Sequence, residues 1–286
     1  VVYSFNNTTA FEPRLALSVA PGDLSGLTLA YNLVSQLQLP QVYLLPFNKD
    51  LGLTRSHHVD LGYWNHLTPS LKLKSGIFYQ YLFDVPVANG NAPTFSTLNL
   101  IDDLPVPGLR NDGTGENYGV EASLEKYFFG NSYMLAGASY YESSFVAADG
   151  IERESRFNGR YTVNGVYGKE WTKLSKNRAI GLSARVLYLG GMKESSIDIT
   201  ASEDKGETVY NTDDPYSQRL KDYFRFDLRL SFRKNKPGYT RTFAIDIQNL
   251  SNQQNEASHY YDQFQQKVVT RYQLGVIPVL VYRIDF

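Results

Sequence analysis

The sequence predicts an all-β fold, and specifically a transmembrane antiparallel β-barrel to which this chain contributes about eleven strands. Three observations lead to this fold class. Polar and apolar residues alternate with a period of two along the whole chain, which is the period of a β-strand. Short and long connections alternate along the chain between these segments. Bulky aromatic residues recur near the segment ends. Together these features are typical of a barrel wall that crosses a membrane.

The clearest alternation lies in "YFRFDLRLSFR" (223–233), where phenylalanine and leucine alternate with arginine, aspartate and serine. A helical period of 3.6 residues would spread both sets around its axis, so this segment is a strand. Ten further segments alternate in the same way, less regularly. In chain order the predicted strands are 12–20, 27–33, 57–64, 71–83, 117–128, 133–144, 156–171, 179–189, 223–233, 240–250 and 278–286.

The connections fall into two kinds. Short ones carry turn residues, as in "PGDLSG" (21–26), "TPS" (68–70), "GNS" (130–132), "KLSKN" (173–177) and "KNKPGY" (234–239). Long polar ones lie between them, at 39–56, 84–116, 145–155, 190–222 and 251–274. Outer-membrane barrels place short turns in the periplasm and long loops outside. A soluble β-sandwich also alternates, and it remains the alternative on pattern alone.

Composition excludes several classes of protein. The net charge is −1, from 28 basic and 29 acidic residues, so nothing indicates a nucleic-acid partner. There is no cysteine, which excludes disulfides and thiolate chemistry. No segment reaches the roughly 18 apolar residues of a membrane helix. The opening "VVYSFNNTTAFEPR" contains no signal peptide, so either a mature form begins there or an upstream part is missing.

The strand count indicates a piece of something larger. The first and last predicted strands both run toward the short-turn side, so the number of strands is odd. Bacterial single-chain barrels have even numbers, because both chain ends lie on one side. We therefore expect this chain to be the C-terminal part of a longer protein.

Several stretches resemble TonB-dependent outer-membrane receptors of the Bacteroidetes type. They include "LPFNKDLGLTRSHHVDLGY" (45–63), "GTGENYGVEASLEKYF" (113–128), "RFNGRYTVNGVYGKEW" (156–171), "DYFRFDLRLSFRKNKPGYTRTFAIDIQNLSNQQN" (222–255) and "YQLGVIPVLVYRIDF" (272–286). The resemblance covers nearly the whole chain. It implies the second half of a 22-stranded barrel. The N-terminal plug domain, the TonB-binding region and the first strands would then lie upstream of Val1.

The function that the resemblance implies is import of a scarce, large nutrient such as a siderophore, a glycan or a peptide. Its implied partners are the rest of the same receptor, TonB and outer-membrane lipid, with a surface lipoprotein as a further candidate. The alternative from another class is a non-transporting barrel that acts as an adhesin or scaffolds a surface complex. The resemblance also implies that the terminal strand carries the outer-membrane assembly signal. Its lipid-facing residues are Leu280, Tyr282, Ile284 and Phe286.

The candidate site is the set of charged residues that alternation places on the inner face of the wall. These residues either meet a plug through ion pairs and water or touch the substrate. The candidates are Glu121, Glu125, Arg160, Arg185, Arg225, Asp227 and Arg229.

Other motifs favour structural roles. His57 and His58 are adjacent and point to opposite faces of a strand, so they cannot share a metal ion without distant partners such as His259. The glycine-rich "NDGTGENYG" (111–119) lacks the lysine and helix of a phosphate loop. No nucleophile elbow or histidine triad is present, so we expect no enzyme activity and no cofactor.

Overall fold

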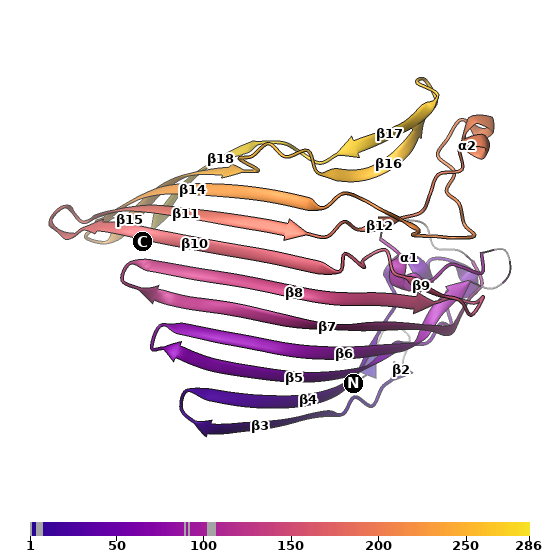
Figure 1. Ribbon diagram of the computed structural model, residues 1–286, viewed down its shortest axis with the longest axis horizontal. Helices are drawn as coiled ribbons and strands as arrows, with labels where there is room; N and C mark the ends of the chain where they lie inside the picture. Colours follow the sequence, from indigo (N-terminus) through magenta and orange to yellow (C-terminus); the bar gives the residue numbers. More distant parts are fainter. Residues whose placement is uncertain (1, 4–7, 89, 91, 102–106) are drawn as a thin grey trace.

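The computed structural model describes residues 2–3, 8–88, 90, 92–101 and 107–286. Within these residues, eleven long strands form one antiparallel sheet in which each strand pairs with the next long strand along the chain (Figure 1). They are β3 (Arg14–Gly22), β4 (Ser25–Gln36), β5 (Thr54–Thr68), β6 (Leu71–Ala88), β7 (Leu109–Phe129), β8 (Ser132–Val146), β10 (Tyr161–Lys173), β11 (Arg178–Leu189), β14 (Tyr223–Lys236), β15 (Tyr239–Gln248) and β18 (Ile277–Asp285). The predicted strands are thus all present, and the predicted fold class is confirmed.

The sheet is open among the described residues. β3 pairs only with β4, and β18 pairs only with β15, so these two strands form the edges. Leu15 lies opposite Tyr31 and Leu280 lies opposite Ile245, which leaves the two edges apart. This is the arrangement expected of part of a barrel wall.

The short connections all lie at one end of the sheet, on the left in Figure 1. The turn between β7 and β8 is Gly130–Asn131, with φ of 62° and 59°. These positive φ values match the right-handed twist of the two strands. The connection from β10 to β11 contains the 3₁₀ helix η3 (Leu174–Lys176) and ends on Asn177, which has a φ of 49°.

The long connections at the other end contain secondary structure that the alternation did not predict. Two helices, α1 (Pro40–Tyr43) and α2 (Ile199–Lys205), lie here together with the 3₁₀ helices η1 (Pro46–Asn48) and η2 (Thr97–Asn99). The short strands at this end are β9 (Glu152–Glu154), β12 (Lys193–Glu194), β13 (Gln218–Arg219), β16 (Glu256–Asp262) and β17 (Lys267–Tyr272), and near the N-terminus β1 (Val2–Tyr3) pairs with β2 (Thr8–Thr9). Long-range bonds hold the hairpin of β16 and β17: the Tyr261 amide donates to Thr208 Oγ1 at 2.9 Å, and His259 Nδ1 contacts Glu194.

Several predicted strand boundaries are wrong. The strand β7 begins at Leu109 and not at residue 117, and β6 continues to Ala88 and does not end at residue 83, so both extend into the predicted long connection 84–116. The alternation of 156–171 predicted a strand from its first residue, but β10 begins at Tyr161. Arg160 has a φ of 70°, in the left-handed region, and the side chain of Asn158 is fully buried. The alternating pattern of 156–160 therefore belongs to a loop.

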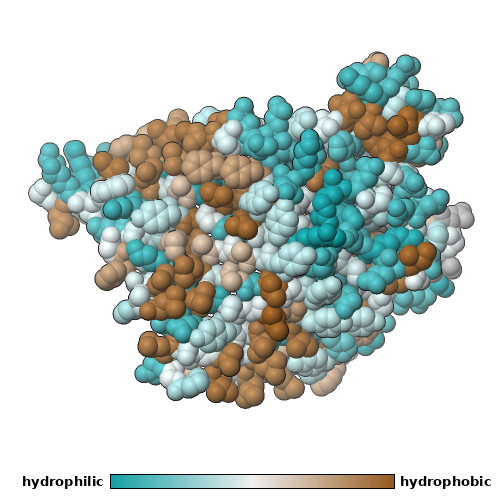
Figure 2. All heavy atoms as spheres, in the orientation of Figure 1, coloured by the Kyte–Doolittle hydropathy of each residue, from teal (hydrophilic) through white to brown (hydrophobic). Residues whose placement is uncertain are grey.

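The buried apolar core lies at the loop end, where the loops pack against the adjoining ends of β6, β7 and β8. One cluster contains Val42, Leu51, Ala88 and Leu109, and a second contains Val87, Phe145 and Ala147. Along the strands, large apolar side chains are instead exposed, as at Leu15, Ile77 and Leu280. On the face shown in Figure 2, hydrophobic residues gather over the strands, whereas hydrophilic residues predominate at the loop end. Exposed apolar side chains in this quantity require a partner other than water.

Candidate functional site

The strand register divides the wall into two faces. Residues directly opposite each other in antiparallel strands share a face. Arg229 lies opposite Asp246, whereas its neighbour Leu228 lies opposite Ile247. Following the pairs from strand to strand gives one continuous polar face and one continuous apolar face. Charged residues on the polar face are Arg14, Asp60, Lys72, Lys74, Glu121, Glu125, Glu170, Arg185, Arg225, Asp227, Arg229, Arg233, Asp246, Arg283 and Asp285.

The polar face carries a hollow of about 740 Å³ over β4 to β10. Its floor is formed by positions with little or no side chain. Gly62 lies opposite Gly76, and Gly137 lies opposite Ser123. Larger residues at these inward positions would fill the space, so the glycines create the hollow.

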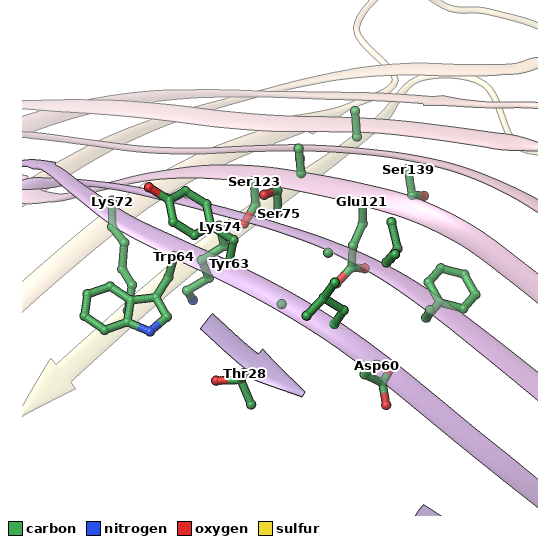
Figure 3. A pocket seen from close by; sticks show the side chains of 18 of the residues that line it. Thr28, Asp60, Tyr63, Trp64, Lys72, Lys74, Ser75, Glu121, Ser123 and Ser139 are labelled. Carbon is green, nitrogen blue, oxygen red and sulfur yellow. The ribbon is translucent and has the colours of Figure 1, made fainter. Parts of the chain in front are cut away.

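Side chains of both charges and several aromatic rings, among them that of Trp64, surround this hollow (Figure 3). Trp64 packs against Gly26, where even a Cβ atom would come within 2.7 Å of the ring nitrogen. The Lys72 ammonium group lies 5.0 Å from the centroid of the Trp64 ring, a cation–π contact. Lys74 Nζ donates to Glu125 Oε1 at 2.6 Å, while Glu121 lies on the floor. The hollow thus offers cations, carboxylates and an aromatic surface to whatever occupies it.

A strip of ion pairs continues the polar face across β10 to β15. Arg229 Nη1 lies 2.8 Å from Asp246 Oδ2, and Arg233 reaches across β11 to Glu170 at 2.6 Å. Arg225 Nε lies 2.6 Å from Asp227 Oδ1, and Arg185 lies directly opposite Asp227. These pairs are partly exposed, so each contributes little to stability. They do keep opposite charges fixed along one side of the wall.

The seven candidate residues fall into three groups. Glu121 lines the hollow, and Glu125 accepts a hydrogen bond from Lys74, which lies at the rim of the hollow. Arg185, Arg225, Asp227 and Arg229 belong to the strip of ion pairs. Arg160 is separate: it precedes β10, and it pairs with Glu154 at 2.6 Å and with Glu142 at 3.4 Å at the loop end.

Sequence reasoning missed the hollow and the residues that define it. Asp60, Trp64, Ser139 and Asn164 line it without having been selected as site residues. The signal that could have found it was the run of glycine, serine and threonine at inward positions of adjacent strands. Only the register shows that these small residues meet.

Electrostatic anchors hold the loops beside the site. Glu154 contacts Lys193 and Arg160, and Arg219 lies 3.5 Å away. Burial raises the pKa of the Glu154 carboxyl, but bonding to Lys193 and Arg160 outweighs burial and leaves this pKa below its ordinary value. The Asp222 carboxylate accepts hydrogen bonds from the hydroxyls of Tyr161 and Tyr188, at 2.5 and 2.9 Å.

The described residues contain neither a cluster suited to a metal ion nor a helix that could cross a membrane. No cluster of three or more histidine, aspartate or glutamate side chains that could hold a metal ion lies within 8–88, 92–101 and 107–286. His57 stacks on Phe83 on one face, while His58 contacts Gln80 on the other, as predicted for neighbours in a strand. No helix in the described part of the chain has the length and apolarity to span a membrane.

An antiparallel wall of long strands, with one exposed apolar face and one charged face, is typical of outer-membrane β-barrels. The chain belongs to the family described as "TonB dependent receptor-like, beta-barrel", whose model matches residues 2–250. Barrels of this family are bacterial outer-membrane proteins, and its members are receptors and transporters, not enzymes.

Solved structures of such receptors have the same fold. BauA, the ferric preacinetobactin receptor of Acinetobacter baumannii, superposes with a TM-score of 0.64 at 14% identity over 96% of this chain and 36% of its own. FyuA, the ferric yersiniabactin uptake receptor of Yersinia pestis, superposes with a TM-score of 0.63 at 13% identity, over 96% of this chain and 37% of its own. The outer-membrane transporter YddB of Escherichia coli superposes with a TM-score of 0.64 at 14% identity, over 98% of this chain and 41% of its own.

This chain therefore spans about two fifths or less of the length of these solved structures. At such low identity the likeness concerns the fold. No curated protein sequence matches the chain.

Proposed function

We propose that this chain forms the C-terminal half of the barrel of a TonB-dependent receptor of the Bacteroidetes type, which imports a scarce, large nutrient across the outer membrane. The observation that carries the proposal is the division of the wall into an apolar face and an ion-paired polar face. The apolar face meets lipid and the polar face lines the lumen. Leu280, Tyr282, Ile284 and Phe286 belong to the lipid side and carry the assembly signal.

The polar face is the surface that a plug domain or a passing substrate contacts. The hollow at Glu121, with Lys74 and Glu125 at its rim, and the strip at Arg185, Arg225, Asp227 and Arg229 present paired charges to the lumen. Arg160 lies nearer the loops, where an incoming substrate arrives first. Further partners of the whole receptor are TonB, the remaining barrel strands and a surface lipoprotein.

Growth and uptake measurements test the proposed function. A strain that lacks the full-length receptor gene is grown with siderophore-bound iron, with a complex glycan or with peptides as the limiting nutrient. Loss of growth on one of these, restored by the gene only when TonB is present, supports import. Normal growth on all three, with loss of surface adhesion or of a co-purifying surface complex, favours the alternative of a non-transporting adhesin or scaffold.

The orientation has its own test. An epitope tag inserted after Asp204, in the loop that contains α2, is expected to bind antibody on intact cells. A tag inserted between Pro237 and Gly238, in the turn from β14 to β15, is expected to bind only after permeabilisation. Surface labelling at the second position contradicts the proposed orientation.

A further inference from the structure

Four cations lie directly opposite one another at the turn end of the wall. Lys173 of β10 lies opposite Arg178 of β11, Arg178 lies opposite Lys234 of β14, and Lys234 lies opposite Arg241 of β15. We refer to these four residues as the cationic row. Side chains in such positions have Cβ atoms about 5 Å apart, and like charges there are destabilising. A bound anion would offset the repulsion between these cations.

In the part of the chain that the structure describes, the cationic row has no acidic partner on its own face. Lys169, Lys176 and Lys236 add further exposed cations at the same end. The only carboxylate in the segments 169–178 and 232–243 is Glu170, which lies on the polar face and pairs with Arg233. Within residues 107–286, none of the four cations of the row forms an ion pair with another described residue.

An apolar row runs beside the cationic row, two residues further from the turns. It consists of Trp171, Ile180, Phe232 and Phe243, each directly opposite the next. These side chains are 40–49% exposed. A hollow of about 570 Å³ is lined by both rows, from Trp171, Ile180 and Phe232 to Lys173, Arg178 and Lys234. Positive charge and apolar surface therefore meet in one site.

Aromatic rings support the cations around this hollow. Lys169 Nζ lies 5.7 Å from the centroid of the Trp171 ring. The Arg241 guanidinium lies 5.0 Å and Lys236 Nζ 5.6 Å from the centroid of the Tyr239 ring. Such contacts orient cations at the boundary between hydrocarbon and water.

We propose that the cationic row binds the headgroup of an anionic phospholipid, a phosphodiester without a compensating amine, from the periplasmic leaflet. Its acyl chains lie along the apolar row. A lipid fits better than an acidic protein segment because the row lies on the apolar face, directly beside side chains suited to hydrocarbon. The inference uses the membrane orientation of the proposed function but not transport itself.

Tryptophan quenching in the full-length receptor tests the lipid site. The receptor is reconstituted in nanodiscs with either phosphatidylglycerol or phosphatidylethanolamine that carries brominated acyl chains, at equal mole fraction. Subtracting the signal of a Trp171→Phe variant isolates Trp171. We expect the anionic lipid to associate at least about fivefold more strongly at Trp171, which corresponds to one headgroup-contacting cation. High salt is expected to reduce the preference.

Two variants show whether the cationic row is responsible. Lys173→Gln combined with Lys234→Gln and Arg241→Gln removes three of its charges and is expected to abolish the preference. The control, Lys49→Gln combined with Lys205→Gln and Lys267→Gln, removes three exposed charges at the loop end and is expected to keep it. If the first variant does not fold, the proposal is still tested by comparing quenching by the two lipids, at low and high salt, in the unaltered receptor. Equal quenching by both lipids, or equal loss in both variants, overturns the proposal.

Discussion

At the scale of single residues, the face on which a side chain stands decides what it can do. Ala138 and Ser139 are neighbours in β8 and nearly equal in size, yet they differ in surroundings. Ala138 lies opposite Ala122 and Val163 on the apolar face. Ser139 lies opposite Glu121 on the polar face and borders the hollow. Substitutions at these two positions therefore differ in the face of the wall that they alter, but not in side-chain size or in depth along the strand.

We expect Ala138→Arg to destabilise the receptor by roughly 2–4 kcal/mol, because it places a charge toward hydrocarbon near the middle of the membrane. Ser139→Arg places the same group beside the Glu121 carboxylate in water and is expected to cost far less. Urea titration of the full-length receptor folded into bilayers measures both changes. Equal destabilisation by the two variants contradicts the assignment of the faces.

The glycines of the hollow allow a second matched pair. An added Cβ at Gly76 would meet the Leu61 carbonyl oxygen at 3.4 Å and Glu121 Cγ at 3.6 Å, which the wall can accommodate. Gly76→Leu is therefore expected to leave folding intact but to fill the hollow and reduce nutrient uptake several-fold. The control is Ser75→Leu, which points to the apolar face. Unchanged uptake in Gly76→Leu indicates that the occupant of the lumen does not use the hollow.

At the scale of elements, alternation predicted strands well where one face was apolar throughout, as in β14. It failed where bonds between distant residues shape the chain. Arg160 continues the alternating pattern but has a φ of 70°, which its neighbours in sequence do not reveal. The hairpin of β16 and β17 depends on contacts with Glu194 and Thr208, more than fifty residues earlier. The hollow depends on strand register, which fixes which small residues meet.

Asp222 anchors the long connection between β11 and β14. Its carboxylate accepts hydrogen bonds from Tyr161, Tyr188 and the Gly191 amide, and the bond from the Tyr161 hydroxyl is the main reason why its pKa lies below the ordinary value. We expect Asp222→Asn to speed hydrogen exchange in 190–221. The matched variant Asp204→Asn, in α2, is expected to leave the same amides unchanged.

The pH dependence of this anchor follows from the direction of the shift. Because the folded pKa of Asp222 is depressed, its contribution to stability is complete above the unfolded value of about 3.9. It is lost as the pH falls through the folded pKa. Exchange in 190–221, corrected for its intrinsic pH dependence, should therefore stay constant from neutral pH down to about 5 and rise only in stronger acid. Loss of protection between pH 7 and 5 argues against this anchor.

At the scale of the whole molecule, the wall has two edges that a membrane does not tolerate. Each of β3 and β18 is paired on one side only among the described residues. In hydrocarbon each unpaired backbone group costs several kcal/mol. Because eleven strands alternate in direction, β3 and β18 run parallel, so joining them would break the antiparallel ladder. In the proposed receptor, further strands would pair with both edges.

We therefore expect β3 and β18 to pair with other strands in the full-length receptor. Their amides, at 14–19, 277 and 279–285, should resist hydrogen exchange as strongly as those of β8, which is paired on both sides. A Leu15→Cys/Leu280→Cys receptor should form no disulfide between these positions, whereas Ile245→Cys/Leu280→Cys, a directly opposed pair, should form one. A ring closed by this chain alone brings Leu15 beside Leu280, so efficient cross-linking of the first pair rules out the half-barrel. Rapid exchange at both edges rules it out independently, because it leaves the edges without any partner strand.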